Sequence, residues 1–235
     1  MRLYPHIPQP FVLITEMGYD TAIRSDQPFH FGVRLFGKAI ELFPYIVYSF
    51  LEIGKQGLGK DSIPFRIDSI TQPMFDKILY QDGATCLGKF EKENLLSLNL
   101  EPEKDLTVEF MTPVKIQTGG QKAESIDFET LIKAAMRRIS ILSYFYGTPV
   151  DTAVDFSGFS EGADKIKKTA DYTRMYEFSR FSGRQKKMVP LNGIVGKVVF
   201  SGQWRRFRSL LELACVCNIG KATSFGFGRM QLSQE

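Results

Sequence analysis

The stretch GKVVFSGQWRRFRSLLELACVCNIGKATSFGFGRMQL, from Gly196 to Leu232, decides the fold. It reads as a strand, a glycine, a helix from Trp204 to Cys217, a Gly-Lys pair, a glycine loop and a second strand. The same order occurs earlier, as the strand FHFGVRLF, a helix from Ala39 to Ile53, the loop GKQGLGK and the strand PFRIDSI. Pro44 is expected to kink the first turns of that earlier helix or to delay its start. This self-similarity predicts two related units rather than one unit with a chance loop.

The residues before Gly196 complete the second unit. Leu106 to Ile116 alternates as a strand, and Ile126 to Tyr146 carries apolar residues at helical spacing. Two more extended segments follow, DYTRMYEFSRF and MVPLNGIVGKVVF, with a hairpin expected across Ser182 to Lys187. With the last helix and strand, the order is β-α-β-β-α-β, which is that of a ferredoxin-like unit.

The first unit shows only the second half of that order after Met1. Ile78 to Leu98 is expected to form hairpin material and a linker. We therefore predict an α+β fold of tandem ferredoxin-like (RRM-like) units, the first incomplete, with domains at residues 1–104 and 105–235. Half a sheet would leave an open edge at Phe11 to Leu35, which favours pairing with a partner or a second copy as a homodimer.

Composition excludes several classes of protein. With 235 residues, 43% of them hydrophobic, and 20 Phe and 9 Tyr, the chain is too apolar to be disordered. Three cysteines make neither a disulfide framework nor a zinc set, so no metal or cofactor is expected. We expect a cytoplasmic protein, because no leader or apolar run of membrane-spanning length is present. The net charge of +4 is small, but Lys165 to Arg208 is strongly basic.

The glycine loop NIGKATSFGFGRM, Asn218 to Met230, has more than one interpretation. Structure alone could explain it, with Gly220 capping the helix and the later glycines starting a strand beside another backbone. A P-loop fails because Ala222 occupies the hydroxyl position, and a dinucleotide fingerprint fails because Gln231 replaces its third glycine. The remaining possibility is a polynucleotide backbone, bound by successive N–H groups and by Lys221, with bases stacking on Phe225 and Phe227.

Several motifs in one order resemble a known family. They are QPFVLI, FHFGVRLFGKAIELFPYIVYSFLEIGKQGLG, RISILSYFYG, RFSGRQKKM, GIVGKVVFSG and the loop GKATSFGFG. Together they resemble the RAMP superfamily of CRISPR-associated proteins, and within it the endoribonucleases that process CRISPR repeat RNA. The resemblance covers most of Pro10 to Leu232.

The resemblance implies a protein that binds the repeat of a CRISPR precursor transcript and cuts it without a metal. The ribose 2′-OH would attack the adjacent phosphate and leave a cyclic phosphate and a 5′-OH, with a base and an acid assisting. It also implies that an N-terminal part, which usually holds the catalytic histidine, is lacking before Met1. The RNA-binding residues that it implies are Gly220, Lys221, Ser224, Gly226, Gly228, Arg229, Arg180, Arg184, Lys186 and Lys187.

The catalytic candidates are the two histidines, His6 and His30. His6 lies in a proline-rich segment and also fits a surface loop. His30 alternates with Phe29 and Phe31, so its side chain faces the opposite way. This orientation fits either a catalytic base in a cleft or an ordinary histidine on the surface of a sheet. The alternative function is a non-cleaving RNA-binding RAMP subunit of a CRISPR effector complex. A nuclease would need one of His6, His30, Tyr172 or Lys221, whereas a scaffold would lose binding in graded, salt-dependent steps.

Overall fold

The computed structural model describes residues 7–15, 24, 27–59, 61–81, 83–85, 105–118, 120–147, 160–183 and 185–234. The chain divides into two compact units, Met1–Gly37 with Ser97–Glu235, and Lys38–Leu96. The N-terminal hairpin thus groups with the C-terminal half of the chain, whereas the boundary between residues 104 and 105 remains a prediction.

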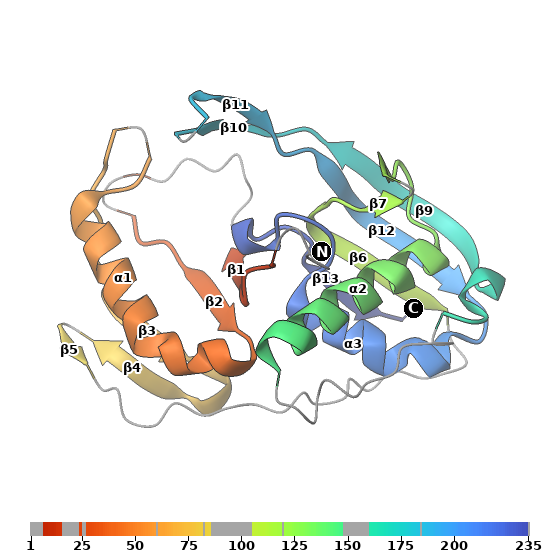
Figure 1. Cartoon of the computed structure of the whole chain (residues 1–235), viewed down its shortest axis with the longest axis horizontal. Helices are drawn as coiled ribbons and strands as arrows, with labels where there is room; N and C mark the ends of the chain where they lie inside the picture. The colour runs from red at the N-terminus through yellow and green to blue at the C-terminus, as the bar shows by residue number, and fades with distance from the viewer. Residues whose placement is uncertain are drawn as a thin grey trace, which may run out of the picture. The chain divides into compact units, whose positions relative to one another are not determined.

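The larger unit contains a four-stranded antiparallel sheet with two helices on one face (Figure 1). The sheet order is β13-β6-β12-β9, and the chain order of its elements is β-α-β-β-α-β, as predicted. The strands are β6 (Leu106–Val114), β9 (Lys167–Tyr176), β12 (Gly193–Ser201) and β13 (Met230–Ser233). The helices are α2 (Phe128–Tyr146) and α3 (Arg208–Cys217), and 3₁₀ turns at Ala163–Lys165 and Trp204–Phe207 precede β9 and α3.

The core lies between this sheet and the two helices. Leu106, Val108 and Phe110 alternate toward it from β6 and are almost fully buried. The ring of Phe128 meets those of Phe200 and Phe207 edge to face, at centroid distances of 5.2 and 5.3 Å. The predicted helix before Tyr146 is confirmed, and it begins where the Asp127 carboxylate accepts a hydrogen bond of 2.7 Å from the Thr130 N–H.

Each of the two extended segments predicted before Gly196 is interrupted. The first forms β9 and β10 (Ser179–Ser182), and the second forms β11 (Lys187–Pro190) and β12. Ser182 pairs with Lys187 across the β10–β11 turn, which confirms the predicted hairpin. Between the main sheet and the hairpin, the Leu191 N–H donates to the Phe178 carbonyl at 2.6 Å, so one backbone hydrogen bond links the two segments at the interruptions. A small hairpin, β7 (Gln117–Thr118) and β8 (Gln121–Lys122), follows β6.

The N-terminal hairpin consists of β1 (Phe11–Thr15) and β2 (Phe31–Leu35). The strands are antiparallel, with Phe11 opposite Leu35 and Thr15 opposite Phe31. They form a sheet of two strands, and each strand has an edge with no strand partner among the described residues. The predicted extended edge at Phe11 to Leu35 is therefore built from these two short strands.

The smaller unit is a helix with a three-stranded sheet. Its helix α1 (Phe43–Gln56) follows a 3₁₀ turn at Gly37–Leu42, so the α-helix begins later than predicted, with Pro44 in its first turn. The strands are β3 (Ser69–Gln72), β4 (Lys77–Gln81) and β5 (Ala84–Thr85), in that sheet order, with a 3₁₀ turn at Pro73–Phe75. The strand predicted at PFRIDSI starts only at Ser69. Among the described residues, no helix is long and apolar enough to cross a membrane.

Candidate nucleic-acid interface

The glycine loop between α3 and β13 is a tight structure with repeated left-handed turns. The helix ends at Cys217, and Asn218, not Gly220, is its C-cap residue, so the capping interpretation of Gly220 is wrong. A 3₁₀ turn at Thr223–Phe225 lies at the loop's centre. The residues with positive φ are Asn218 (55°), Gly220 (79°), Ala222 (62°), Gly226 (85°) and Gly228 (78°).

Two of these glycines are required by close backbone approaches. A Cβ at Gly228 would lie 1.9 Å from the carbonyl oxygen of Ile219, and one at Gly220 would lie 2.4 Å from that of Lys115. Both distances are far below van der Waals contact, and the positive φ angles also disfavour side chains. The loop therefore folds closely onto itself and onto the end of β6.

Most of the loop's N–H groups are already used inside the protein. Ile219 donates to Gly228 at 2.9 Å, Gly228 to Pro113 at 3.1 Å and Lys221 to Lys115 at 2.9 Å. The N–H groups of residues 225–227 close the turns of the 3₁₀ segment, and that of Arg229 donates to the Thr112 hydroxyl. The expectation that this loop presents a run of free N–H groups to a phosphate is thus wrong at these positions. At these positions, contacts with a ligand must therefore be made by side chains.

The N-terminal hairpin holds the loop from the other side. Arg229 donates from Nη1 to the carbonyl of Thr15 at 3.3 Å, and Gly226 lies against the carbonyl of Leu13. Arg34 of β2 donates to the Val216 carbonyl, at the end of α3, at 2.7 Å. Cations at a helix C-terminus also complement its dipole. Arg229 and Gly226 therefore have a structural role in joining β1 to the loop.

Three lysines from different segments gather beside the loop. Lys221 donates from Nζ to Gln117 Oε1 at 2.5 Å, and Lys115 donates from Nζ to the Pro190 carbonyl at 3.2 Å. Burial, followed by the positive charges of Lys122 and Lys221, lowers the pKa of Lys115. Lys115 and Lys122 escaped sequence reasoning because they lie about 100 positions from the loop and no local motif marks them.

The β10–β11 hairpin is brought to the loop through one aromatic contact. The Arg180 guanidinium lies 4.5 Å from the centroid of the Phe225 ring, which is 49% exposed. The Phe227 ring is buried in the protein, so the expectation that bases stack on it is wrong. Lys186 and Lys187, at the hairpin's turn, are exposed, and Ser224 is half-buried. Arg184 lies outside the described residues. The structure therefore joins Arg180 to the loop and leaves the two turn lysines facing solvent.

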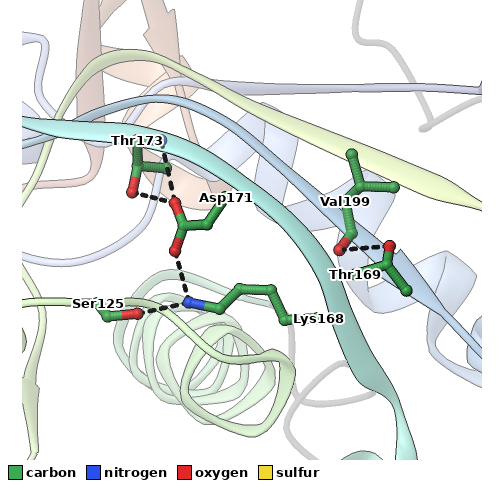
Figure 2. A network of polar contacts seen from close by, with 6 residues as sticks. All are labelled: Ser125, Lys168, Thr169, Asp171, Thr173 and Val199. Carbon is green, nitrogen blue, oxygen red and sulfur yellow. Dashed lines mark hydrogen bonds and ion pairs between the residues drawn. The ribbon is translucent and has the colours of Figure 1, made fainter.

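Several cations of the basic segment are engaged by other residues. Figure 2 shows Lys168 on the edge strand β9, which contacts the Asp171 carboxylate at 2.5 Å and donates to the Ser125 hydroxyl at 2.6 Å. Burial opposes ionisation of Asp171, yet hydrogen bonds from Lys168 and Thr173 lower its pKa. Arg208 is also held in an ion pair with Glu212 at 2.8 Å. The total of basic residues thus overstates the charge that this segment offers to a ligand.

The histidines do not form a catalytic pair among the described residues. His30 is exposed just before β2, and no hydrogen bond joins it to another described residue. Phe29 and Phe31 stack at 6.1 Å, which agrees with the predicted alternation of His30. His6 lies outside the described residues. Tyr172 is 72% exposed on β9, opposite Lys197. In the part of the chain that is described, no group of three or more His, Cys, Asp or Glu side chains could hold a metal ion.

Solved structures with a similar fold include three that span most of this chain. A Thermus thermophilus Cas6 product complex has a TM-score of 0.60 and 17% identity, covering 96% of this chain and 83% of that one. A second Cas6 product complex has a TM-score of 0.52 and 15% identity, with coverages of 96% and 82%. A partial Cas6-RT-Cas1–Cas2 complex has a TM-score of 0.51 and 14% identity, covering 96% of this chain and 39% of that one. These likenesses confirm the α+β fold of tandem ferredoxin-like units.

Sequence comparison gives a more specific assignment. An uncharacterised protein of Archaeoglobus fulgidus is 30% identical over 122 residues, 49% of this chain, and the match spans only 38% of that relative. A family model described as an N-terminal domain matches residues 1–95. The model of the CRISPR-associated endoribonuclease Cas6 matches residues 108–230, more than half of the chain, including β9, β12, most of β6, both helices of the larger unit and the glycine loop. The chain therefore belongs to the CRISPR-associated endoribonuclease Cas6 family.

Proposed function

We propose that this protein binds the repeat part of a CRISPR precursor RNA and cuts it to give guide RNAs. The observation that carries the proposal is the family match over residues 108–230, which contains the glycine loop and the cations around it. The fold also matches a Cas6 product complex over 96% of this chain. The exposed cations Lys221, Arg180 and Lys187 are suited to backbone phosphates, and the half-exposed Phe225 ring is suited to base stacking.

The chemistry that we propose needs no metal. The ribose 2′-OH loses its proton to a base and attacks the adjacent phosphorus, the bond to the 5′-oxygen breaks, and that oxygen takes a proton. The products are a 2′,3′-cyclic phosphate and a 5′-OH, so atoms and charge balance. His30, or His6, would supply the base or the acid, and Lys221 or Tyr172 would stabilise the charge that develops on the phosphate oxygens.

A second candidate function is RNA binding without cleavage, as a RAMP subunit of a CRISPR effector complex. It is favoured by the isolation of His30, which has no hydrogen-bond partner among the described residues to act with it as an acid-base pair. Binding would require the same loop, lysines and arginines. Other CRISPR proteins are candidate partners, because a similar fold occurs in a Cas6-RT-Cas1–Cas2 complex, and the short β1–β2 sheet could pair with a second copy.

The test is incubation of the chain with labelled CRISPR repeat RNA in EDTA, with binding and cleavage followed together. Cutting at one position, with a cyclic phosphate on the 5′ fragment, is the result expected of the nuclease. Tight binding without cutting would support the RNA-binding subunit. A chain that neither binds nor cuts would rule out both functions. His30→Ala should abolish cutting if His30 takes part and should leave binding within about twofold, because the side chain is exposed and its replacement should disturb the fold little.

A further inference from the structure

Lys115, Lys122 and Lys221 form a cluster that comes together from three separate segments. Lys115 follows the end of β6, Lys122 belongs to β8, and Lys221 lies in the glycine loop. The backbone N–H of Lys221 donates to the Lys115 carbonyl at 2.9 Å, which holds the loop against β6. Gln117 lies directly across the β7–β8 hairpin from Lys122 and accepts a hydrogen bond from Lys221. One backbone contact and one side-chain contact therefore place the three cations on one surface.

The cluster has no carboxylate partner among the described residues. Ion pairs in that part of the chain include those of other cations: Lys55, Arg66, Lys133, Lys168, Lys197 and Arg208. Burial lowers the pKa of Lys115, and the positive charges of Lys122 and Lys221 lower it further. Like charges held together without counter-charge destabilise the free protein and are a common feature of anion sites.

Two of the lysines are ordered before any ligand binds. The Nζ of Lys115 is held by the Pro190 carbonyl, and that of Lys221 by the Gln117 side chain. An ammonium group has three N–H donors and each of these bonds uses one, so donors remain for an anion. This ordering reduces the entropy lost on binding. The neighbouring Arg180–Phe225 pair offers a stacking surface, which favours a nucleic acid over an acidic protein as the source of the anion.

We propose that Lys115, Lys122 and Lys221 together bind one backbone phosphate of the RNA. This proposal rests on the proposed function and adds Lys115 and Lys122 to its binding residues. The contact is sequence-independent, because it reads phosphate and not base edges. It positions the strand beside Phe225.

The experiment measures the affinity of the whole chain for labelled repeat RNA and for an unrelated single-stranded RNA, across a range of salt concentrations. The variants are Lys122→Gln and the double variant Lys115→Gln/Lys122→Gln. The matched control is Lys133→Gln, which removes the same charge from an exposed lysine of α2 that is paired with Glu129. Thermal unfolding of each variant verifies the fold, and Lys122→Arg should retain binding because it retains the charge.

We expect the double variant to bind both RNAs about tenfold more weakly and to lose about 1 from the slope of log affinity against log salt, with the control unchanged. If the double variant binds as tightly as Lys133→Gln, the phosphate site is overturned. Repeat processing is then judged separately, by the cleavage assay described above. Equal binding of polyglutamate, lost in the same variant, would overturn the assignment to phosphate. The wild-type chain could bind both RNAs equally well, with both affinities reduced in the double variant. That result would support the phosphate site and contradict recognition of the repeat. Failure to bind either RNA overturns both.

Discussion

Replacing Gly228 by alanine should damage the larger unit far more than an ordinary glycine replacement. The new Cβ would lie 1.9 Å from the Ile219 carbonyl oxygen, so the backbone must move. That movement disrupts two hydrogen bonds, from Ile219 to Gly228 and from Gly228 to Pro113. An L residue at φ 78° costs about 1–2 kcal/mol, and each lost hydrogen bond about 1 kcal/mol. We expect the free energy of unfolding to fall by about 3–4 kcal/mol.

The matched control is Gly120→Ala. Gly120 has a φ of 83°, but a Cβ there would meet no atom within 4 Å, so only the conformational cost of about 1–2 kcal/mol applies. The assay is urea unfolding followed by the fluorescence of Trp204, which is the single tryptophan and is buried in the core of this unit. Equal losses of stability in the two variants would refute the argument that the loop depends on the close approach at Gly228.

Three other predictions follow from ionisation and from contacts. Hydrogen bonding lowers the pKa of Asp171 in the folded state. The ionised carboxylate therefore stabilises the fold above the unfolded pKa, and this contribution is lost as pH falls through the folded pKa. Asp171→Asn should reduce the loss of unfolding free energy at acidic pH. Burial raises the pKa of Cys215 to about 12 and that of Cys217 to about 11, so iodoacetamide should modify both thiols only after unfolding, as read by mass spectrometry. A double-mutant cycle of Arg180→Ala and Phe225→Ala should give a coupling energy of about 0.5–1 kcal/mol, and a value of zero would show that the stacked pair adds no stability.

Local patterns predicted most of the secondary structure. The apolar spacing of Ile126 to Tyr146 predicted α2 to within two residues, and the turn residues between Ser182 and Lys187 predicted the β10–β11 hairpin. Boundaries were less accurate where context matters. Pro44 was predicted to delay its helix or to kink it, and α1 indeed begins at Phe43 after a 3₁₀ turn, because proline suits only the first turn of an α-helix.

The candidate binding site was predicted only in outline. The loop was identified from its residues and Arg180 from the family resemblance, and the structure places Arg180 over Phe225. The free N–H groups expected in the loop are instead bonded to its own residues and to β6. Arg229, chosen as an RNA contact, reaches the Thr15 carbonyl. Residue type alone does not reveal which donors are already used, because some partners lie within the folded loop and others lie about a hundred positions or more away along the chain.

The sequence by itself determined the order of the elements, the β-α-β-β-α-β unit and the positions of its turns, since periodicity and turn chemistry act over a few residues. Only the tertiary structure decided which of these elements became neighbours. β6 pairs with β13 and with β12, and this pairing brings Lys115 beside Lys221 and the Thr112 hydroxyl beside the loop. Such contacts depend on long-range strand pairing, which is set by burial of the whole core and leaves no signal in any single stretch of sequence.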